Sequence, residues 1–221
     1  MQAATPANDN KNASFLLLRQ VENPSHKSGQ KKAENPSRKW GQKKAREGIP
    51  CLAFPVGEIY MKPLVICRVT DKYIRFLHSR DSRVQYNKGA SRPYVGVVLF
   101  VGEFRYFVPM ESPKPNHANL KAGAHLMKMD GGRLGLLGFN NMIPVRDDVL
   151  VPLDIDALED TAYAELLRKQ AYFCNRNKTA ILDRASRTYY DTVNGSNKFF
   201  LRICCDFKAL EKACRQFNPL R

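Results

Sequence analysis

The chain has 221 residues, with 36 lysines and arginines against 21 acidic residues, a formal net charge of +15 and a sequence pI near 9.7. Its 43% hydrophobic and 10% aromatic residues are enough to bury a core, which excludes a wholly disordered, collagen-like or coiled-coil chain. The longest apolar run, Tyr94–Gly102, is far shorter than the roughly 20 residues that span a bilayer. We therefore expect a soluble, cytoplasmic protein whose charge favours a polyanionic partner such as nucleic acid rather than a membrane.

Composition changes near residue 60. Residues 1–60 carry 10 basic and 5 acidic side chains with little apolar periodicity, which predicts a disordered basic extension. Within it, two adjacent twelve-residue units agree at ten positions, Glu22–Ala33 (ENPSHKSGQKKA) and Glu34–Ala45 (ENPSRKWGQKKA). Residues 61–221 retain 26 basic and 16 acidic residues, so the basic character belongs to the predicted folded domain as well.

The folded domain is predicted to open with an apolar strand, Pro63–Val69. Asp71 suits the start of a short helix that places Tyr73, Ile74 and Leu77 on one face. The helix therefore has one apolar side to bury against the strands that follow.

The most distinct predicted element is a hairpin over residues 94–110. Its first strand, YVGVVLFV, is apolar enough to be covered on both faces, and Gly102 stands first in a two-residue connection that suits a type II′ turn. Beyond the hairpin we expect short strands and then helices, namely strands 124–129, 133–139, 142–145 and 149–155 and helices 160–175, 178–192 and 206–217. The predicted fold class is α+β, with a compact, barrel-like antiparallel sheet of five to seven strands.

Several kinds of site are excluded by the residues present. The chain has no phosphate-binding glycine loop, no His-Glu metal cassette and no Gly-x-Ser-x-Gly elbow, and its carboxylates are too sparse in the sheet region for a two-metal nuclease. We therefore predict no metal and no cofactor. The cysteines form no C-x-x-C pair and no zinc-ligand spacing, so we expect reduced, partly buried thiols at Cys51, Cys67, Cys174, Cys204, Cys205 and Cys214.

The segment Pro109–His117 (PMESPKPNH) carries the chemistry that stands out. It follows a predicted buried strand and combines the Ser112 hydroxyl, the Lys114 ammonium and several stiffening prolines. Such groups can bind a phosphate and stabilise a developing oxyanion, and a partly desolvated lysine can also transfer protons. Proline-rich, lysine-bearing loops without a catalytic role are also common after strands.

The order of several segments resembles the ToxN/AbiQ toxins of type III toxin-antitoxin systems. These segments are YIRFL, PYVGVVLFVGEFRYFVPM ending in SPK-x-x-H, LGLLGFNNMIPV and YAELLRKQAYFCNRN, and the resemblance covers residues 61 to about 217. The resemblance implies a Kid/MazF-like sheet surrounded by helices. It also implies a metal-independent endoribonuclease that is inhibited by a repeat RNA antitoxin.

The resemblance implies a set of site residues. Ser112 and Lys114 match the serine and lysine of the family's active-site segment, and His117 matches a further position. The family's other basic catalytic residue corresponds here to Arg92 or, if the loop is realigned, to Lys88. Two further residues belong to the candidate catalytic set: Tyr86, which stands where the family has a tyrosine, and Glu111, which replaces a hydroxyl residue of the family and is a candidate general base.

The implied reaction is attack by the RNA's own 2′-hydroxyl, which leaves a 2′,3′-cyclic phosphate and a 5′-hydroxyl and excludes DNA as a substrate. The antitoxin RNA is expected in a basic groove and in a closed protein-RNA ring, and the function would be growth arrest or abortive infection of phage. Lys88 and His117 are candidate RNA contacts. Further candidates, each of which is otherwise a solvated surface charge, are Lys72, Arg75, Lys121, Arg187 and Lys198. The alternative is a basic RNA-binding module that does not cleave.

The repeat in residues 1–60 admits two interpretations. Each unit corresponds to 12 × 3 = 36 nucleotides, a plausible length for an RNA repeat, and the family's antitoxin is encoded directly upstream of its toxin. The segment is then largely translated antitoxin sequence, with the functional start at Met61. Otherwise it is a basic arm that helps to bind RNA.

Overall fold

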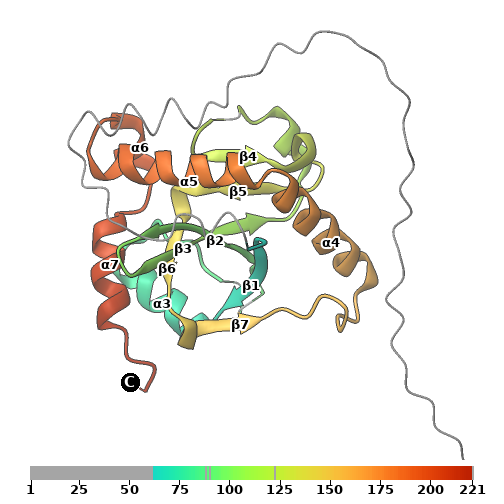
Figure 1. Ribbon diagram of the computed structural model, residues 1–221, viewed down its shortest axis with the longest axis horizontal. Coiled ribbons are helices and arrows are strands. Elements are labelled where there is room, and N and C mark those ends of the chain that lie inside the picture. Colours follow the sequence, from blue (N-terminus) through green and yellow to red (C-terminus); the bar gives the residue numbers. More distant parts are fainter. Residues whose placement is uncertain (1–61, 88, 90, 122, 221) are drawn as a thin grey trace, which may run out of the picture. The chain divides into compact units, whose positions relative to one another are not determined.

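The computed structural model describes residues 62–220 apart from residues 88, 90 and 122 (Figure 1). Met61, the repeat units and the predicted extension lie outside the described residues. The strands and α-helices are β1 (Val65–Val69), α3 (Asp71–Arg80), β2 (Tyr94–Val101), β3 (Phe104–Glu111), β4 (Leu126–Lys128), β5 (Leu136–Gly138), β6 (Ile143–Val145), β7 (Leu150–Pro152), α4 (Thr161–Arg176), α5 (Lys178–Val193), α6 (Lys198–Ile203) and α7 (Phe207–Gln216). Short 3-10 helices lie between them at η1 (Pro115–Asn119), η2 (Met129–Gly132), η3 (Phe139–Asn141) and η4 (Asp147–Val149).

Each predicted strand and helix corresponds to an observed element. Helix α3 buries the predicted face of Tyr73, Ile74 and Leu77, although its N-cap is Thr70 and Asp71 lies in the first turn. The strands from β4 to β7 are shorter than predicted, and 3-10 helices take up part of their flanks, namely Met129, Phe139 and Val149. The 3-10 helices and helix α6 were not predicted.

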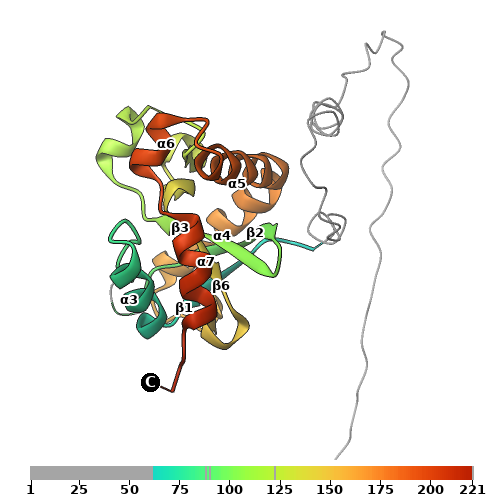
Figure 2. The same ribbon diagram turned by 90° about the vertical axis from the view of Figure 1, so that its left-hand side faces the viewer.

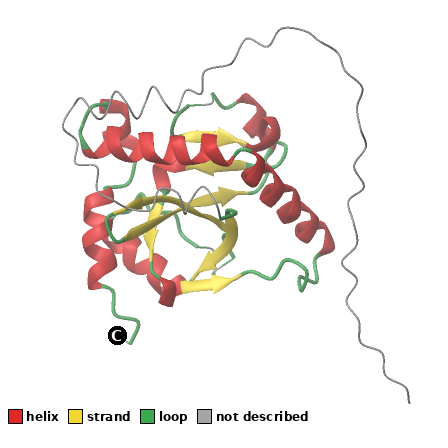
Figure 3. Ribbon diagram, in the orientation of Figure 1, coloured by secondary structure: helices red, strands yellow, loops and turns green. Residues whose placement is uncertain are grey.

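The strands, yellow in Figure 3, form one antiparallel sheet. It has seven strands in the order β4-β5-β3-β2-β1-β7, with β6 beside β3. Strand β3 pairs with β6 through residues 105–107 and with β5 through residues 110–111, so its two ends have different neighbours. Within the described residues β6 and β7 do not pair, so the sheet is open and the predicted barrel-like closure is wrong. Each of these two short strands contains a proline, Pro144 or Pro152, which lacks the N–H that a further pairing would need.

Helices pack against the sheet on several sides (Figure 2). Helix α7 contacts both α3 and β6, and α5 contacts β2. The buried Glu211 of α7 links these layers, since it accepts hydrogen bonds from the hydroxyls of Tyr106 (3.0 Å) and Tyr189 (2.6 Å) and lies 2.8 Å from the Lys208 ammonium. A polar network therefore ties β3, α5 and α7 together inside the core.

The described residues bear on the state of the cysteines and on membrane-spanning helices. Cysteines 67, 174, 204, 205 and 214 are free and buried, as expected for reduced thiols, and Cys51 lies outside the described residues. None of the helices between residues 62 and 220 is long and apolar enough to span a membrane.

Candidate active site

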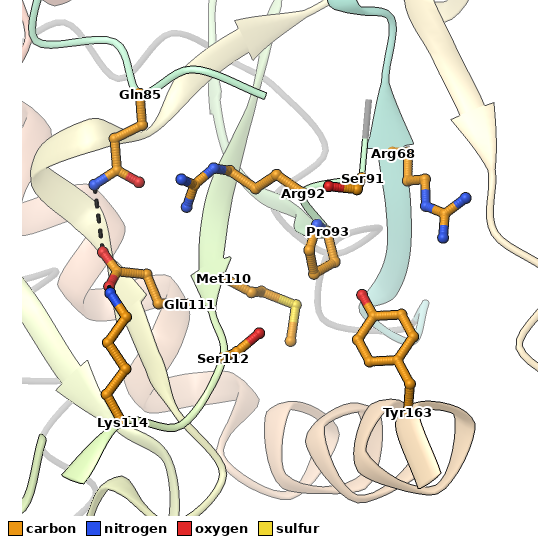
Figure 4. A pocket seen from close by; sticks show the side chains of 10 residues that line it. All are labelled: Arg68, Gln85, Ser91, Arg92, Pro93, Met110, Glu111, Ser112, Lys114 and Tyr163. Atoms are coloured by element: carbon orange, nitrogen blue, oxygen red, sulfur yellow. Dashed lines mark hydrogen bonds and ion pairs between the residues drawn. The ribbon is translucent and has the colours of Figure 1, made fainter. Parts of the chain in front are cut away.

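The end of β3 opens into a cavity of about 490 Å³ (Figure 4). Four of the predicted catalytic residues line it, namely Arg92, Glu111, Ser112 and Lys114. The other lining residues are Arg68, Gln85, Ser91, Pro93, Met110 and Tyr163. The chain segments that carry these side chains come from β1, the loop before β2, the end of β3 and the start of α4.

The register of the central hairpin explains why Arg92 and Ser112 meet. Tyr94 at the start of β2 pairs with Pro109 near the end of β3, and the Met110 N–H donates to the Pro93 carbonyl at 2.9 Å. The residues just before β2 therefore lie beside the residues just after β3. This pairing brings a guanidinium and a serine hydroxyl from different parts of the chain to one cavity.

Gly135 holds the same chain segment from the opposite side. Its φ is +98°, and an added Cβ would lie 1.9 Å from the Glu111 carbonyl oxygen and 3.2 Å from the Ser112 carbonyl carbon. Only glycine allows the two backbones to approach so closely. The position of Glu111 and Ser112 therefore depends on a residue that does not itself line the cavity.

The Glu111 carboxylate is surrounded by polar groups. Gln85 Nε2 donates to Oε1 at 3.3 Å, Lys114 Nζ lies 3.4 Å from Oε2, and His117 Nε2 lies 4.0 Å from Oε2. Gln85 is itself held by Asn141 Oδ1 at 3.3 Å. The carboxylate thus lies between neighbours on two chain segments, the loop before β2 and the segment after β3.

His117 is the buried member of this group. Its side chain is 3% exposed, and its Nδ1 atom is buried and has no hydrogen-bond partner among the described residues. It does not line the cavity, so it can reach the cavity's contents only through Glu111. The sequence placed His117 with the RNA-binding residues, whereas its burial makes direct contact with a large ligand difficult.

Arg92 is oriented by the loop that precedes β2. Its Nε donates to the Tyr86 carbonyl oxygen at 3.2 Å. The Tyr86 side chain is 58% exposed and stacks on His78 with ring centroids 3.9 Å apart, so it lies outside the cavity lining. Tyr86 thus contributes its backbone to the site, and the alternative basic residue Lys88 lies outside the described residues.

The five other predicted RNA contacts are spread over the surface. None of Lys72, Arg75, Lys121, Arg187 and Lys198 lines the cavity. Lys72 Nζ donates to the Pro219 carbonyl oxygen at 2.6 Å, Arg75 pairs with Asp71, and Arg187 lies 3.5 Å from Asp191. Lys121 and Lys198 are exposed. Their role in binding RNA stays a prediction.

Sequence reasoning missed Arg68, Gln85 and Tyr163 in the cavity wall. Arg68 lies in β1, and Tyr163 lies in the first turn of α4, where its N–H is accepted by the capping Asp160 carboxylate at 2.9 Å. No local pattern marks these residues, because only the packing of α4 across from β1 brings them together. Alternation along β1 could have indicated that Arg68 faces away from the buried Cys67 and Val69.

The cavity combines groups that suit phosphodiester chemistry. Lys114 and Arg92 supply positive charge, Ser112 supplies a hydroxyl donor, and Glu111 supplies a carboxylate that can accept a proton. Together these groups can hold a phosphate, stabilise charge on its oxygens and remove a proton from a nearby hydroxyl.

Comparisons with known proteins point in the same direction. A family model described as "Toxin ToxN, type III toxin-antitoxin system" matches residues 65–215. The endoribonuclease ToxN of Bacillus thuringiensis subsp. kurstaki is 35% identical over 159 residues, covering 68% of this chain and 82% of its own, and the endoribonuclease AbiQ of Lactococcus lactis subsp. lactis is 32% identical over 171 residues, covering 72% and 92%.

Solved structures agree in fold. A type III toxin described as selectively inhibited by a non-coding RNA pseudoknot matches with a TM-score of 0.63 at 30% identity, covering 70% of this chain and 98% of its own. AbiQ, described as a lactococcal anti-phage endoribonuclease, matches with a TM-score of 0.63 at 29% identity and the same coverage. The chain therefore belongs to the ToxN family of toxins of type III toxin-antitoxin systems.

Proposed function

We propose that this chain is an endoribonuclease toxin that cleaves RNA in the cytoplasm without a metal ion. The observation that carries the proposal is the shared cavity of Arg92, Glu111, Ser112 and Lys114 in a chain of the ToxN family. Relatives named endoribonuclease ToxN and endoribonuclease AbiQ support the same activity.

The proposed step uses the RNA's own nucleophile. The O2′ oxygen forms a bond to phosphorus while the P–O5′ bond breaks, which leaves a 2′,3′-cyclic phosphate and, once the leaving oxygen takes up a proton, a 5′-hydroxyl. Glu111 accepts the 2′-hydroxyl proton. Lys114 and Arg92 stabilise the charge that develops on the phosphoryl oxygens, and Ser112 donates a hydrogen bond to one of them.

The test is cleavage of a short RNA in EDTA, with the product ends identified by mass spectrometry. We expect cyclic-phosphate ends, and no cleavage when the nucleotide at the scissile bond lacks its 2′-hydroxyl. Lys114→Ala should lower kcat about 100- to 1000-fold because it removes a donor to the developing charge. Lys212→Ala is the matched control, since this exposed lysine of α7 lies outside the cavity and outside the predicted RNA contacts.

Other outcomes would decide against the enzyme. Full activity in purified Lys114→Ala or Ser112→Ala would remove the assigned residues. Salt-sensitive RNA binding without any cleavage would instead favour the alternative function, a non-catalytic RNA-binding module. The RNA pseudoknot inhibition described for the similar solved structure supports RNA binding under either function.

We further propose that a repeat RNA antitoxin inhibits this chain in a closed protein-RNA ring, and that the toxin acts in growth arrest or abortive infection. The described selective inhibition of a similar toxin by an RNA pseudoknot supports the RNA partner. Residues 61–221 carry the proposed activity, a boundary supported by the family match that begins at residue 65. Near-identical codons in the two twelve-residue units would favour translated antitoxin sequence, whereas divergent synonymous codons would favour a selected peptide arm.

A further inference from the structure

The cavity continues beyond the groups assigned to the scissile phosphate. In Figure 4, Lys114, Glu111 and Gln85 lie on one side, Arg92 and Ser112 lie in the middle, and Arg68 and Tyr163 lie on the far side. A volume of about 490 Å³ is more than a single phosphate occupies, and it lies within the range of sites that enclose a nucleotide-sized ligand. The side of Arg68 and Tyr163 therefore has no assigned ligand.

Arg68 neighbours the Tyr163 hydroxyl but lacks the carboxylate partner that several other arginines of this domain have. Arg83, Arg105 and Arg146 each lie within 2.6–2.9 Å of an aspartate oxygen. In the described part of the chain no carboxylate lies within ion-pair distance of Arg68, and its buried Nε has no hydrogen-bond acceptor. A buried N–H donor without an acceptor is costly, so the fold retains at this point a group that a ligand oxygen would satisfy.

Tyr163 is a second hydrogen-bond donor beside Arg68. The Asp160 side chain caps the first turn of α4 at the Tyr163 N–H, which holds the tyrosine in place across from β1. Burial raises the pKa of Tyr163, and the neighbouring Arg68 offsets part of that rise, so the hydroxyl is protonated near neutral pH and able to donate. Two donors from distant segments thus converge on the same end of the cavity.

We propose that Arg68, together with the Tyr163 hydroxyl, binds the phosphodiester next to the scissile one in the RNA strand. The planar guanidinium matches the oxygens of a phosphate, and an RNA strand places such an anion on either side of the bond that is cut. Met110 and Pro93 form an apolar wall in the same cavity, which suits the ribose carbons between the two phosphates. This subsite rests on the proposed endoribonuclease activity.

The experiment neutralises one substrate charge at a time. Short RNAs with a single cleavage site carry a methylphosphonate, which removes one negative charge, at the linkage 5′ or 3′ of the scissile bond. kcat/KM is measured for the wild-type chain, Arg68→Ala, Arg68→Lys and Arg133→Ala. Arg133→Ala is the matched control for lost charge, because Arg133 is 81% exposed, pairs with Asp130 and lies outside the cavity lining.

We expect one methylphosphonate position to lower kcat/KM of the wild-type chain and of Arg133→Ala by about tenfold or more, the worth of one charge-assisted hydrogen bond. Arg68→Ala should lose a similar factor on the unmodified RNA and be insensitive to that methylphosphonate. The kcat/KM of Arg68→Lys on the unmodified RNA should lie between those of the wild-type chain and Arg68→Ala, because lysine keeps the positive charge but lacks the planar guanidinium with its paired N–H donors.

Three results would overturn the subsite: a wild-type chain indifferent to both methylphosphonates, an Arg68→Ala loss of equal size on all substrates, or a loss that follows base identity instead of linkage charge. The first result is measured on the wild-type chain alone, so it tests the subsite even if Arg68→Ala does not fold. If the wild-type chain cleaves no RNA, the proposed activity fails separately. The Kd values of the same RNAs for the wild-type chain and Arg68→Ala then decide the subsite by the same criteria.

Discussion

Replacing Gly135 by alanine tests whether backbone contact positions the cavity's catalytic segment. The added Cβ would lie 1.9 Å from the Glu111 carbonyl oxygen, whereas real Cβ contacts do not fall below 3.0 Å, so the segment must move by at least 3.0 − 1.9 = 1.1 Å. A displacement of that size at a reacting group costs about 100-fold in rate. The positive φ of +98° adds strain of about 1–3 kcal/mol to the folded state.

Gly131→Ala is the matched control. Gly131 also has a positive φ, +64°, but an added Cβ would meet nothing within 4 Å. The positive φ should therefore cost both variants about 1–3 kcal/mol of unfolding free energy in urea, and Gly135→Ala should lose more because of its backbone clash. Only Gly135→Ala should lose about 100-fold in kcat/KM on a single-site RNA. A folded Gly135→Ala whose activity stays within about threefold of Gly131→Ala, far short of the expected loss, would refute the positioning argument.

Three further predictions follow from the contacts described above. His117→Gln should lower kcat with little change in KM, since His117 approaches Glu111 Oε2 without lining the cavity; an unchanged kcat would argue against this role. Glu211→Ala removes the acceptor of the buried Tyr189 hydroxyl and leaves Tyr106 only a 3.4 Å contact to the Phe207 carbonyl, so it should lose about 3–5 kcal/mol of unfolding free energy in urea titrations, while kcat per folded molecule is preserved. Burial alone would raise the pKa of Asp81, but hydrogen bonds from Arg83 and the Asp206 N–H outweigh it and lower the pKa below 3.8. The stabilisation that ionised Asp81 contributes is therefore complete above pH 3.8 and is lost as the pH falls further. Urea unfolding of Asp81→Asn from pH 6 to about pH 2.5 should therefore show a less steep loss of stability in acid than the wild-type chain shows.

Local patterns in the sequence were sufficient for most elements. The spacing of Tyr73, Ile74 and Leu77 predicted the buried face of α3, and the apolar run before Gly102 predicted the hairpin of β2 and β3. Helical and strand periodicity report which side of a segment is apolar, and burial then follows from that side. The sequence likewise singled out Ser112 and Lys114, because they lie two positions apart in one loop.

Only the tertiary structure decided how distant segments meet. The pairing of Tyr94 with Pro109 brings Arg92 to Ser112, and the packing of α4 brings Tyr163 to the cavity from a distant part of the chain. The tertiary structure also decided that the sheet stays open. The short strands in the sequence predicted a barrel-like sheet, but β6 and β7 do not pair in the described residues. Periodicity carries no information on register or on which surfaces dock, since both depend on the combined packing of residues that are far apart along the chain.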